Sequence, residues 1–489
     1  MKRNWLAAAI SAFMLLGAMP ALPAYAEDDA ETLSFENLEY QISEDGHVII
    51  TNCLQNETNC NVPAEIDGAP VTEIAGSAFS ECYFLESVTL PESIDTIGRQ
   101  AFSACTALEW IYMPEEITSM GAGVFDGCTS LRDIVLPTGI TELPEATFYE
   151  CTSLETVIVG EGTEVIGPEC FYGCTSLTAA KLPESLTTIG DYAFENCSSM
   201  LLMEIPENMV NIGKYVFLGC SSLDEFAVDE NNEMFCDVDG VLFTKDMVTL
   251  VRYPEAIENS EYTVPDGCTQ LANGCFVDAV HLTSVDLNQA TVYGMDVFFR
   301  CTGLKEITFP EGTTELGAYM MSYCSSLEKV NFPSTLKTVG NYTFHTCAGL
   351  TEITVPEGVE TIGQYSFFNC IALKKLSLPD TITSIGDGAF GYYAESEDTE
   401  PIKVPGFVVD YRNNKAIYEF VKLYDLEGTG TYSGRIWTTV GIIAGAVLIV
   451  GAIVLLIVRI VNANKIKPVK GGRKGSETKR PDRNNKKKG

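Results

Sequence analysis

Hydrophobic and polar positions in this chain repeat with a period of 23 residues between Ala78 and Phe390. Each unit reads A-F-x-x-C-x-x-L-x-x-I-x-L-P-E-x-hydrophobic-x-x-I-G, and we find thirteen units. The aromatic position of the unit is occupied by Phe79, Phe102, Phe125, Phe148, Phe171, Phe194, Phe217, Phe276, Phe298, Met321, Phe344, Phe367 and Phe390. A unit this short cannot bury its apolar face alone, so successive coils must stack on one another.

Within one unit the pattern predicts a short strand that ends at proline, which cannot donate a hydrogen bond to a neighbouring strand. In the segment Leu85–Pro91, Val88 and Leu90 would point inward while Ser87 and Thr89 point outward. No long amphipathic helix fits between such strands. A period of 20 to 29 residues with fixed Leu and Ile positions is typical of a leucine-rich-repeat solenoid. We therefore expect about thirteen 23-residue coils with a parallel β-sheet on one face and low helix content.

Segments that depart from the repeat predict caps and an insertion. Asp45-Gly46 marks the turn of an N-terminal β-hairpin cap, and Asp239-Gly240 marks a β-hairpin insertion. Ile417, Phe420 and Val421 have the spacing of a C-terminal capping helix. The expected order is an N-terminal β cap over 27–63, repeats over 64–223, the insertion over 224–264, repeats over 265–393, an acidic loop and capping helix over 394–426, and a stalk over 427–435.

The two ends of the sequence predict export and membrane anchoring. A basic start, an apolar stretch and Ala24-Tyr25-Ala26 indicate a signal peptide over 1–26, the alternative being a short buried helix. The 23 uncharged residues of 436–458 predict a single transmembrane helix. The following segment, 459–489, holds twelve Lys or Arg against two acidic residues, which predicts a cytoplasmic tail. We expect a single-pass type I membrane protein with extracellular repeats.

The repeat L-x-x-I-x-L-P-E-x-hydrophobic-T-x-I-G-x-x-A-F-x-x-C resembles the BspA-like, or treponemal-type, leucine-rich repeat; the segments 177–197 and 350–370 are examples. The insertion hairpin, with Arg252-Tyr253-Pro254 after it, also resembles a feature of that family. The resemblance covers roughly residues 36–426. It implies a bacterial surface or secreted protein, and some members of the family are adhesins. No cell-wall sorting signal or dockerin module accompanies the repeats in this sequence.

The formal net charge of −36 combines two opposed regions. Segment 27–435 holds 17 Lys or Arg against 65 Asp or Glu, a net charge of −48. Such a surface repels nucleic acid and favours basic partners or divalent cations. General solubility outside the cell is the plainer alternative.

Cysteine follows the aromatic position by three residues in every unit except those with Ala279 and Tyr393. Equivalent side chains of stacked coils point the same way, whereas a disulfide requires converging Cβ vectors, so we expect a column of buried thiols. Cys53 and Cys60 differ because they close a short loop in the cap, where a disulfide is an open possibility. Cys236 and Cys268 have no assigned role.

The sequence predicts neither a metal site nor a catalytic site. No C-x-x-C pair occurs, and His47, His281 and His345 are scattered. A nucleophilic Cys–His pair requires an electropositive setting that this acidic region lacks. We therefore expect no enzyme activity and no cofactor.

One group of outward strand positions is apolar. Trp110 and Tyr112 stand two residues apart on one strand, and Val135 and Ile158 continue the column on the next two coils. A contiguous aromatic and aliphatic patch on a polar sheet is a ligand-binding candidate, unless a cap or a neighbouring molecule covers it. The sequence thus predicts a cell-surface binding or adhesion protein for an extracellular protein or glycan. The alternatives are a structural spacer and an accessory protein that holds polysaccharide.

Overall fold

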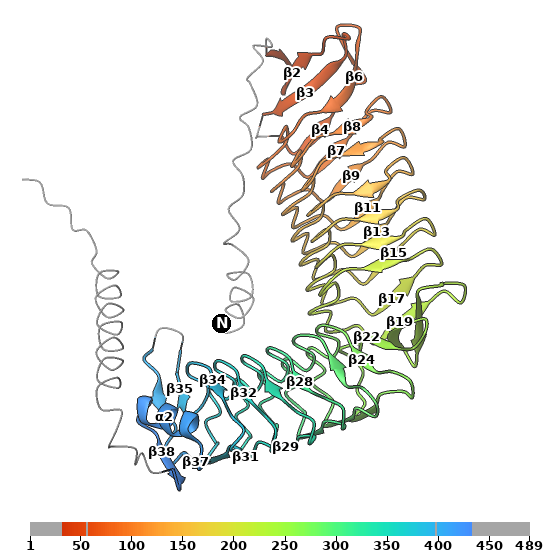
Figure 1. Cartoon of the computed structure of the whole chain (residues 1–489). Coiled ribbons are helices and arrows are strands. Elements are labelled where there is room, and N and C mark those ends of the chain that lie inside the picture. The colour runs from red at the N-terminus through yellow and green to blue at the C-terminus, as the bar shows by residue number, and fades with distance from the viewer. Residues whose placement is uncertain (1–31, 55–56, 397–398, 433–489) are drawn as a thin grey trace, which may run out of the picture. The chain divides into compact units, whose positions relative to one another are not determined.

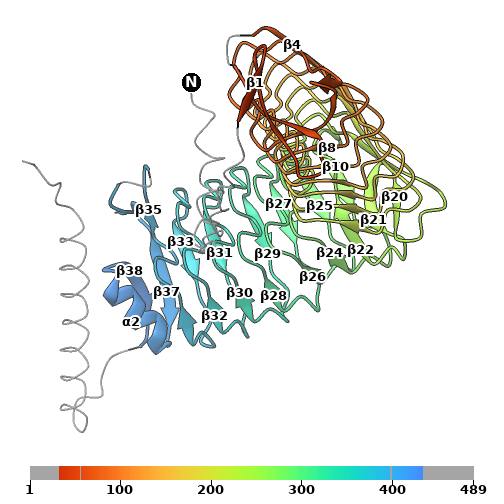
Figure 2. The ribbon, with the colours of Figure 1, turned by 90° about the horizontal axis from the view of Figure 1, so that it is seen from above.

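The computed structural model describes residues 32–54, 57–396 and 399–432. The chain coils from the hairpin of β2 (Leu38–Ile42) and β3 (Val48–Cys53) at one end to helix α2 (Lys415–Leu423) at the other (Figure 1). Each coil contributes one short strand to each of two parallel ladders. We name these ladders the first wall and the second wall. In the second half of the stack the two walls run along opposite sides (Figure 2).

The first wall is built from the L-x-x-I-x-L segments of the repeat. Its strands are β4 (Asn59–Asn61), β7 (Ser87–Thr89), β9 (Trp110–Tyr112), β11 (Asp133–Val135), β13 (Thr156–Ile158), β15 (Ala179–Lys181), β17 (Leu202–Ile205), β19 (Glu225–Val228), β23 (Glu261–Thr263), β25 (Ser284–Asp286), β27 (Glu306–Thr308), β29 (Lys329–Asn331), β31 (Glu352–Thr354), β33 (Lys375–Ser377), β37 (Val408–Arg412) and β38 (Glu427–Gly430).

The second wall is built from the T-x-I-G segments, which the sequence analysis did not predict as strands. It contains β3 (Val48–Cys53), β6 (Ala69–Ile74), β8 (Thr96–Ile97), β10 (Ser119–Met120), β12 (Glu142–Leu143), β14 (Val165–Ile166), β16 (Thr188–Ile189), β18 (Asn211–Ile212), β22 (Thr249–Arg252), β24 (Gln270–Leu271), β26 (Val292–Tyr293), β28 (Glu315–Leu316), β30 (Thr338–Val339), β32 (Thr361–Ile362) and β34 (Ser384–Ile385). Their backbone groups pair from coil to coil because buried N–H and C=O groups require partners.

The predicted fold class needs correction. The solenoid has about 16 turns and two walls, because cap segments without the repeat motif continue the stack. In the described part of the chain, moreover, no helix is both long enough and apolar enough to cross a membrane. The segment 436–458, where the transmembrane helix was expected, lies outside the described residues, as do the expected signal peptide over 1–26 and the tail over 459–489. The fold class is therefore a capped β-solenoid, and the transmembrane helix is withdrawn from it.

Phenylalanine rings form a continuous stack inside the solenoid. From Phe79 to Phe217, consecutive ring centroids lie 4.9–6.1 Å apart with nearly parallel planes. A packed aromatic pair contributes about 0.5–1.5 kcal/mol beyond the burial of its surface. Because every ring is nearly inaccessible to solvent, the column holds each coil to its neighbours.

The cysteine column hydrogen-bonds one coil to the next. Each of ten thiols lies 3.0–3.2 Å from the carbonyl oxygen of the aromatic position, Phe or Met321, one coil earlier, as in Cys105 Sγ to Phe79 O and Cys370 Sγ to Phe344 O. All ten cysteines are buried. The thiol is a second donor to a buried carbonyl that already accepts a backbone N–H of its own turn, as Phe125 O accepts the Cys128 N–H at 3.0 Å.

The insertion interrupts both the repeat and the core. The strands β20 (Phe235–Val238) and β21 (Val241–Thr244) form a hairpin around Asp239-Gly240, and β22 then returns the chain to the second wall. The buried core divides here into two clusters, one reaching Leu242 and the other beginning at Val241. We call the contact between these clusters the junction.

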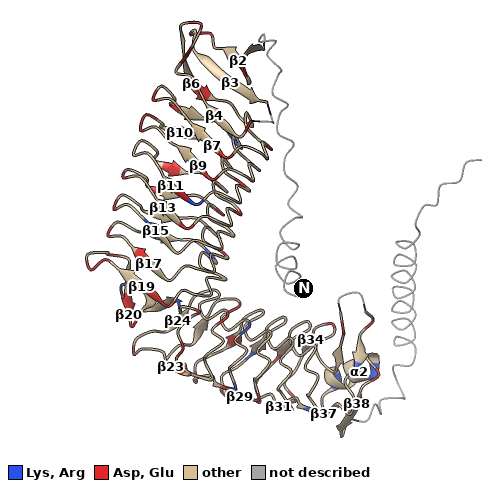
Figure 3. Ribbon diagram, turned by 180° about the vertical axis from the view of Figure 1, so that it is seen from behind, with Lys and Arg blue, Asp and Glu red and all other residues tan. Residues whose placement is uncertain are grey.

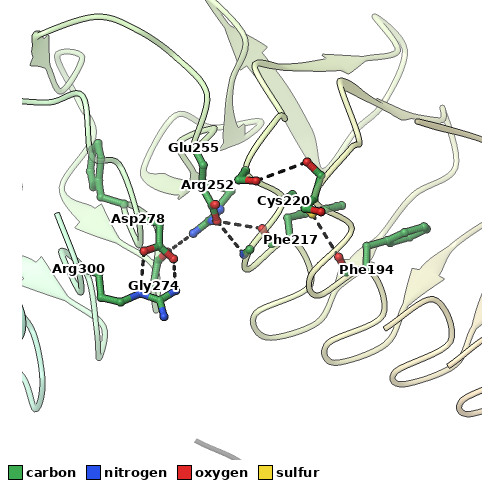
Figure 4. Close-up of polar contacts among 12 residues, drawn as sticks. Phe194, Phe217, Cys220, Arg252, Glu255, Gly274, Asp278 and Arg300 are labelled. Carbon is green, nitrogen blue, oxygen red and sulfur yellow. Dashed lines mark hydrogen bonds and ion pairs between the residues drawn. The ribbon is translucent and has the colours of Figure 1, made fainter. Parts of the chain in front are cut away.

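Side chains of the insertion replace the regular contacts at the junction (Figure 4). The Tyr253 N–H donates to Cys275 O at 2.8 Å. In a regular coil the N–H of the aromatic residue makes this hydrogen bond, so Tyr253 takes the aromatic position here. Arg252 Nη2 donates to Phe217 O at 3.2 Å. In the regular coils a column thiol donates to the equivalent carbonyl. Three residues after Tyr253, where a regular coil places its cysteine, stands Ala256, which has no thiol. Arg252 therefore supplies the donor that the column lacks at this point.

Glu255 bonds both to Arg252 and to the preceding coil. Its Oε1 accepts hydrogen bonds from the Gly219 N–H at 2.8 Å and from Arg252 Nη2 at 2.5 Å. Arg252 Nη1 donates in turn to Gly274 O at 2.6 Å. Both charged side chains are buried, so the ion pair connects the two halves of the core across the junction.

Two caps close the stack. At the N-terminal end β1 (Leu33–Phe35), β2 (Leu38–Ile42) and β3 form an antiparallel meander, and β5 (Glu65–Ile66) pairs with β6. At the other end β35 (Tyr392–Tyr393) pairs with β36 (Ile402–Lys403), and α2 (Lys415–Leu423) begins at Asn414, whose Oδ1 accepts the Ile417 N–H. Residues 427–430, expected as the start of a stalk, form β38 beside β37.

Candidate binding surface

The four predicted binding residues project from the first wall. Trp110, Tyr112, Val135 and Ile158 are 50%, 43%, 59% and 42% exposed, respectively. They come from β9, β11 and β13, whose middle residues are buried. Alternation along the strand therefore turns these side chains outward, and no part of the described cap covers them.

Strand register brings Val135 and Ile158 into one column, and the 23-residue repeat places Tyr112 at the equivalent position one coil earlier. Val135 pairs with Ile158, which pairs with Lys181, and Thr89 pairs with Tyr112 on the other side. Between β9 and β11 the coils are joined by the Arg132 N–H, which donates to Glu109 O at 3.4 Å. We call Trp110, Tyr112, Val135 and Ile158 the apolar patch.

Polar groups bound the patch. The Tyr112 hydroxyl donates to Glu92 Oε1 at 2.7 Å, and this hydrogen bond raises the pKa of the phenol. In the neighbouring column the Thr156 hydroxyl donates to Asp133, and Arg132 pairs with Glu155 at 3.7 Å. A ligand on the patch would thus meet an apolar centre with a polar, solvated edge, the arrangement usual in protein recognition.

Several tyrosines on the turn edge of the stack pack against one another in pairs. Tyr149 stacks on Tyr172 with centroids 4.7 Å apart, and Tyr319 stacks on Tyr342 at the same distance. Their ring faces are therefore covered by neighbouring rings. These tyrosines stabilise the turn edge of the coils rather than offer a platform to a ligand.

Two exposed aromatic residues were missed in the sequence analysis. Tyr83 and Phe84 are 48% and 62% exposed in the turn that leads into β7, one coil from Trp110. The corresponding positions of the next coils hold small residues, as in Thr106-Ala107 and Thr129-Ser130. The repeat shows this contrast, but Tyr83 and Phe84 stand in the turn, outside the strand positions that predicted the apolar patch.

Acidic residues are distributed over successive coils, with few basic residues between them (Figure 3). On the first wall a hollow of about 400 Å³ opens between β25 and β27, and Asp286, Asn288 and Glu306 contribute to its lining. Asn288 Nδ2 already donates to Val264 O and to Asp266. The hollow is open and has a mixed polar and apolar lining, and it lies several coils from the apolar patch.

Histidine and cysteine side chains are not gathered into a metal site within the described ranges. His345 packs against aromatic rings, and burial lowers its pKa to about 4. Cys53 and Cys60 are buried free thiols in this structure, and Cys236 and Cys268 are also free. Burial raises the pKa of the column thiols, so they remain protonated and unsuited to nucleophilic attack.

Comparison with known proteins places the repeat in a sequence family. A family model described as the BspA type leucine-rich repeat region matches residues 52–167, 141–272 and 269–397. Among the curated proteins, none matches this chain.

Three solved bacterial proteins share this fold. A leucine-rich cell surface protein from Faecalibacterium prausnitzii is 24% identical with a TM-score of 0.58, and the match covers 76% of this chain and 97% of that one. A leucine-rich repeat protein from Bacteroides ovatus is 24% identical with a TM-score of 0.57, over 82% and 99% of the two chains. The pneumococcal vaccine antigen PcpA is 20% identical with a TM-score of 0.51, also over 82% and 99%.

Proposed function

Because the chain belongs to the BspA-type leucine-rich repeat family, we propose that it is a non-catalytic binding protein of the bacterial cell surface. A surface role agrees with the similar protein of F. prausnitzii, described as a leucine-rich cell surface protein. The ligand would be an extracellular protein or glycan, bound through the first wall of the solenoid.

The apolar patch is the observation that carries this proposal. Its four side chains are exposed on neighbouring coils, whereas the equivalent positions of β27, β29 and β31 hold Glu, Thr, Lys and Asn. Aromatic residues such as Trp and Tyr dominate the affinity of many interfaces. The stack fixes the backbone beneath them, so little ordering is required on binding.

Binding of the purified chain to bacterial and host cells, extracellular matrix proteins and polysaccharides tests the proposal. Replacing Trp110→Ala and Tyr112→Ala together should reduce binding at least tenfold, since one good aromatic anchor contributes about 2 kcal/mol. The matched control is Glu352→Ala with Thr354→Ala, which changes the equivalent outward positions of β31. Equal binding by both double variants would remove the patch as the site.

Absence of any ligand in these assays would favour the structural alternative, a spacer whose solenoid only projects from the surface. Binding to polysaccharide alone would favour an accessory role in holding a glycan near other proteins. Circular dichroism of each variant shows whether the fold is retained.

A further inference from the structure

Three thiols meet at the N-terminal end of the stack. Cys53 ends β3 in the second wall, Cys60 lies at the centre of β4 in the first wall, and Cys82 belongs to the first repeat turn. All three are buried, and the Cys53 thiol is in hydrogen-bonding contact with both of the others. Thiols from both walls thus converge on one point.

This arrangement differs from the cysteine column. Column thiols lie 3.0–3.2 Å from a carbonyl oxygen, whereas Cys82 Sγ is 3.9 Å from Cys53 O and Cys53 Sγ is 3.8 Å from Leu54 O. Carbonyl contacts therefore hold the cap thiols less closely than the column thiols. A disulfide requires side chains that converge, and Cys53 and Cys60 approach each other from opposite walls.

The two thiols also differ in reactivity. The hydrogen bond with Cys53 lowers the pKa of Cys60, while the same contact raises the pKa of Cys53 to about 12. A thiolate is the attacking species in disulfide exchange. Cys60 is therefore the first nucleophile, and Cys53 the thiol that follows.

We propose that Cys53 and Cys60 form a disulfide by exchange with a low-molecular-weight disulfide such as oxidised glutathione, and that this bond joins the two walls at the cap. The Cys60 thiolate attacks one sulfur of the small disulfide, forms a mixed disulfide and releases one thiolate. Cys53 loses its proton and attacks the Cys60 sulfur, which releases the second thiolate. Two protein thiols are oxidised and one small disulfide is reduced to two thiols.

The bond would hold the cap on the first coil. Cys53 is hydrogen-bonded to the first repeat turn through its N–H, which donates to Ala78 O, and Cys60 pairs in register with Val88 of β7. Linking them closes a short loop and restricts the unfolded chain. The other fifteen of the seventeen cysteines stay reduced.

Peptide mapping of the full chain tests the proposal. After folding, the chain is incubated with oxidised glutathione, denatured in acid, alkylated with iodoacetamide and cleaved at glutamate. Glu57 is the one glutamate between the two cysteines, so cleavage there separates their fragments unless a disulfide joins them. We expect joined fragments that part on reduction, with fifteen alkylated cysteines. Alkylation of all seventeen, a lasting glutathione adduct on Cys60, or a Cys53–Cys82 bond would overturn it.

Two variants separate the bond from general oxidation. Cys60→Ala should leave Cys53 alkylated, whereas Cys128→Ala, a matched change in the column, should retain the bond. The oxidised wild type should melt about 2–4 °C above the reduced form, and Cys60→Ala should show no such shift. Equal melting of the oxidised and reduced wild type would overturn the role in holding the cap.

Discussion

Regular coil contacts and the junction perform the same task with different chemistry. Between regular coils, a neutral thiol donates a hydrogen bond to the carbonyl of the aromatic residue, as Cys151 donates to Phe125 O. At the junction the buried guanidinium of Arg252 donates to Phe217 O, and its charge requires Glu255 as a partner. The difference teaches that a repeat can be interrupted if its hydrogen bonds are replaced, but the replacement introduces buried charge.

Removing Arg252 should have the largest effect. Arg252→Ala leaves two carbonyls without this donor and Glu255 as a buried carboxylate without its cation, so the free energy of unfolding should fall by about 3–5 kcal/mol. Chemical denaturation followed by circular dichroism measures this. A double-mutant cycle with Glu255→Gln gives the coupling energy, and a loss below about 1 kcal/mol would show that the junction does not depend on the pair.

Changing one column thiol should cost less. Cys151→Val fills a similar volume but removes the thiol hydrogen bond to Phe125 O, which still accepts the Cys128 N–H, for a loss of about 1 kcal/mol in the free energy of unfolding. Cys151→Ala adds a small cavity and should lose slightly more. If Cys151→Val is as stable as the wild type, the thiol acts by packing alone.

Stability should depend on pH through Glu195, a partly buried residue that follows Phe194 of the aromatic column. Burial raises the pKa of Glu195 to about 7, with Glu169 adding to the rise and Arg300 opposing it. The pKa of a glutamate in the unfolded chain is about 4.3, so between about pH 4 and pH 7 the folded chain binds more protons than the unfolded chain. The free energy of unfolding therefore decreases as pH rises from about 5 to about 8. Glu195→Gln should reduce this decrease by about 1 kcal/mol in denaturation series at several pH values. An unchanged slope would assign the dependence to other groups.

The smallest effect is expected for an exposed ion pair on the first wall. Arg132 and Glu155 lie 3.7 Å apart, and both side chains are more than half exposed. Arg132→Ala should change the free energy of unfolding by less than about 0.5 kcal/mol, and added salt should abolish the difference. If Arg132→Ala lowers the free energy of unfolding as much as Arg252→Ala does, charges at the junction do not matter more than charges on the surface.

The repeat predicted most of the fold because each coil contacts mainly its neighbours. The Phe and Cys positions are buried, and Asp239-Gly240 turns a hairpin where the sequence placed one. The second wall was missed because strands of two residues, such as Thr96–Ile97, are too short to show a period. β38 was missed because Glu427–Gly430 contains two glycines and no apolar residue.

Residues at the junction could not be predicted from the repeat. Arg252 contacts Phe217 and Gly274, which are 35 and 22 residues away along the chain. Nothing in the local sequence requires this arginine to be buried. The exposed residues of the apolar patch could be named in advance because alternation along a strand fixes their direction, but a ligand for them remains a proposal.

The junction also limits how the gene can change its length. Regular coils are interchangeable, so recombination between neighbouring repeats could delete or add one without disturbing the contacts on either side. Arg252 fits only where the preceding coil offers Phe217 O and its own coil has Ala256 in place of the column cysteine. Evolution can therefore lengthen or shorten either half of the solenoid, whereas the residues of the junction must be kept together.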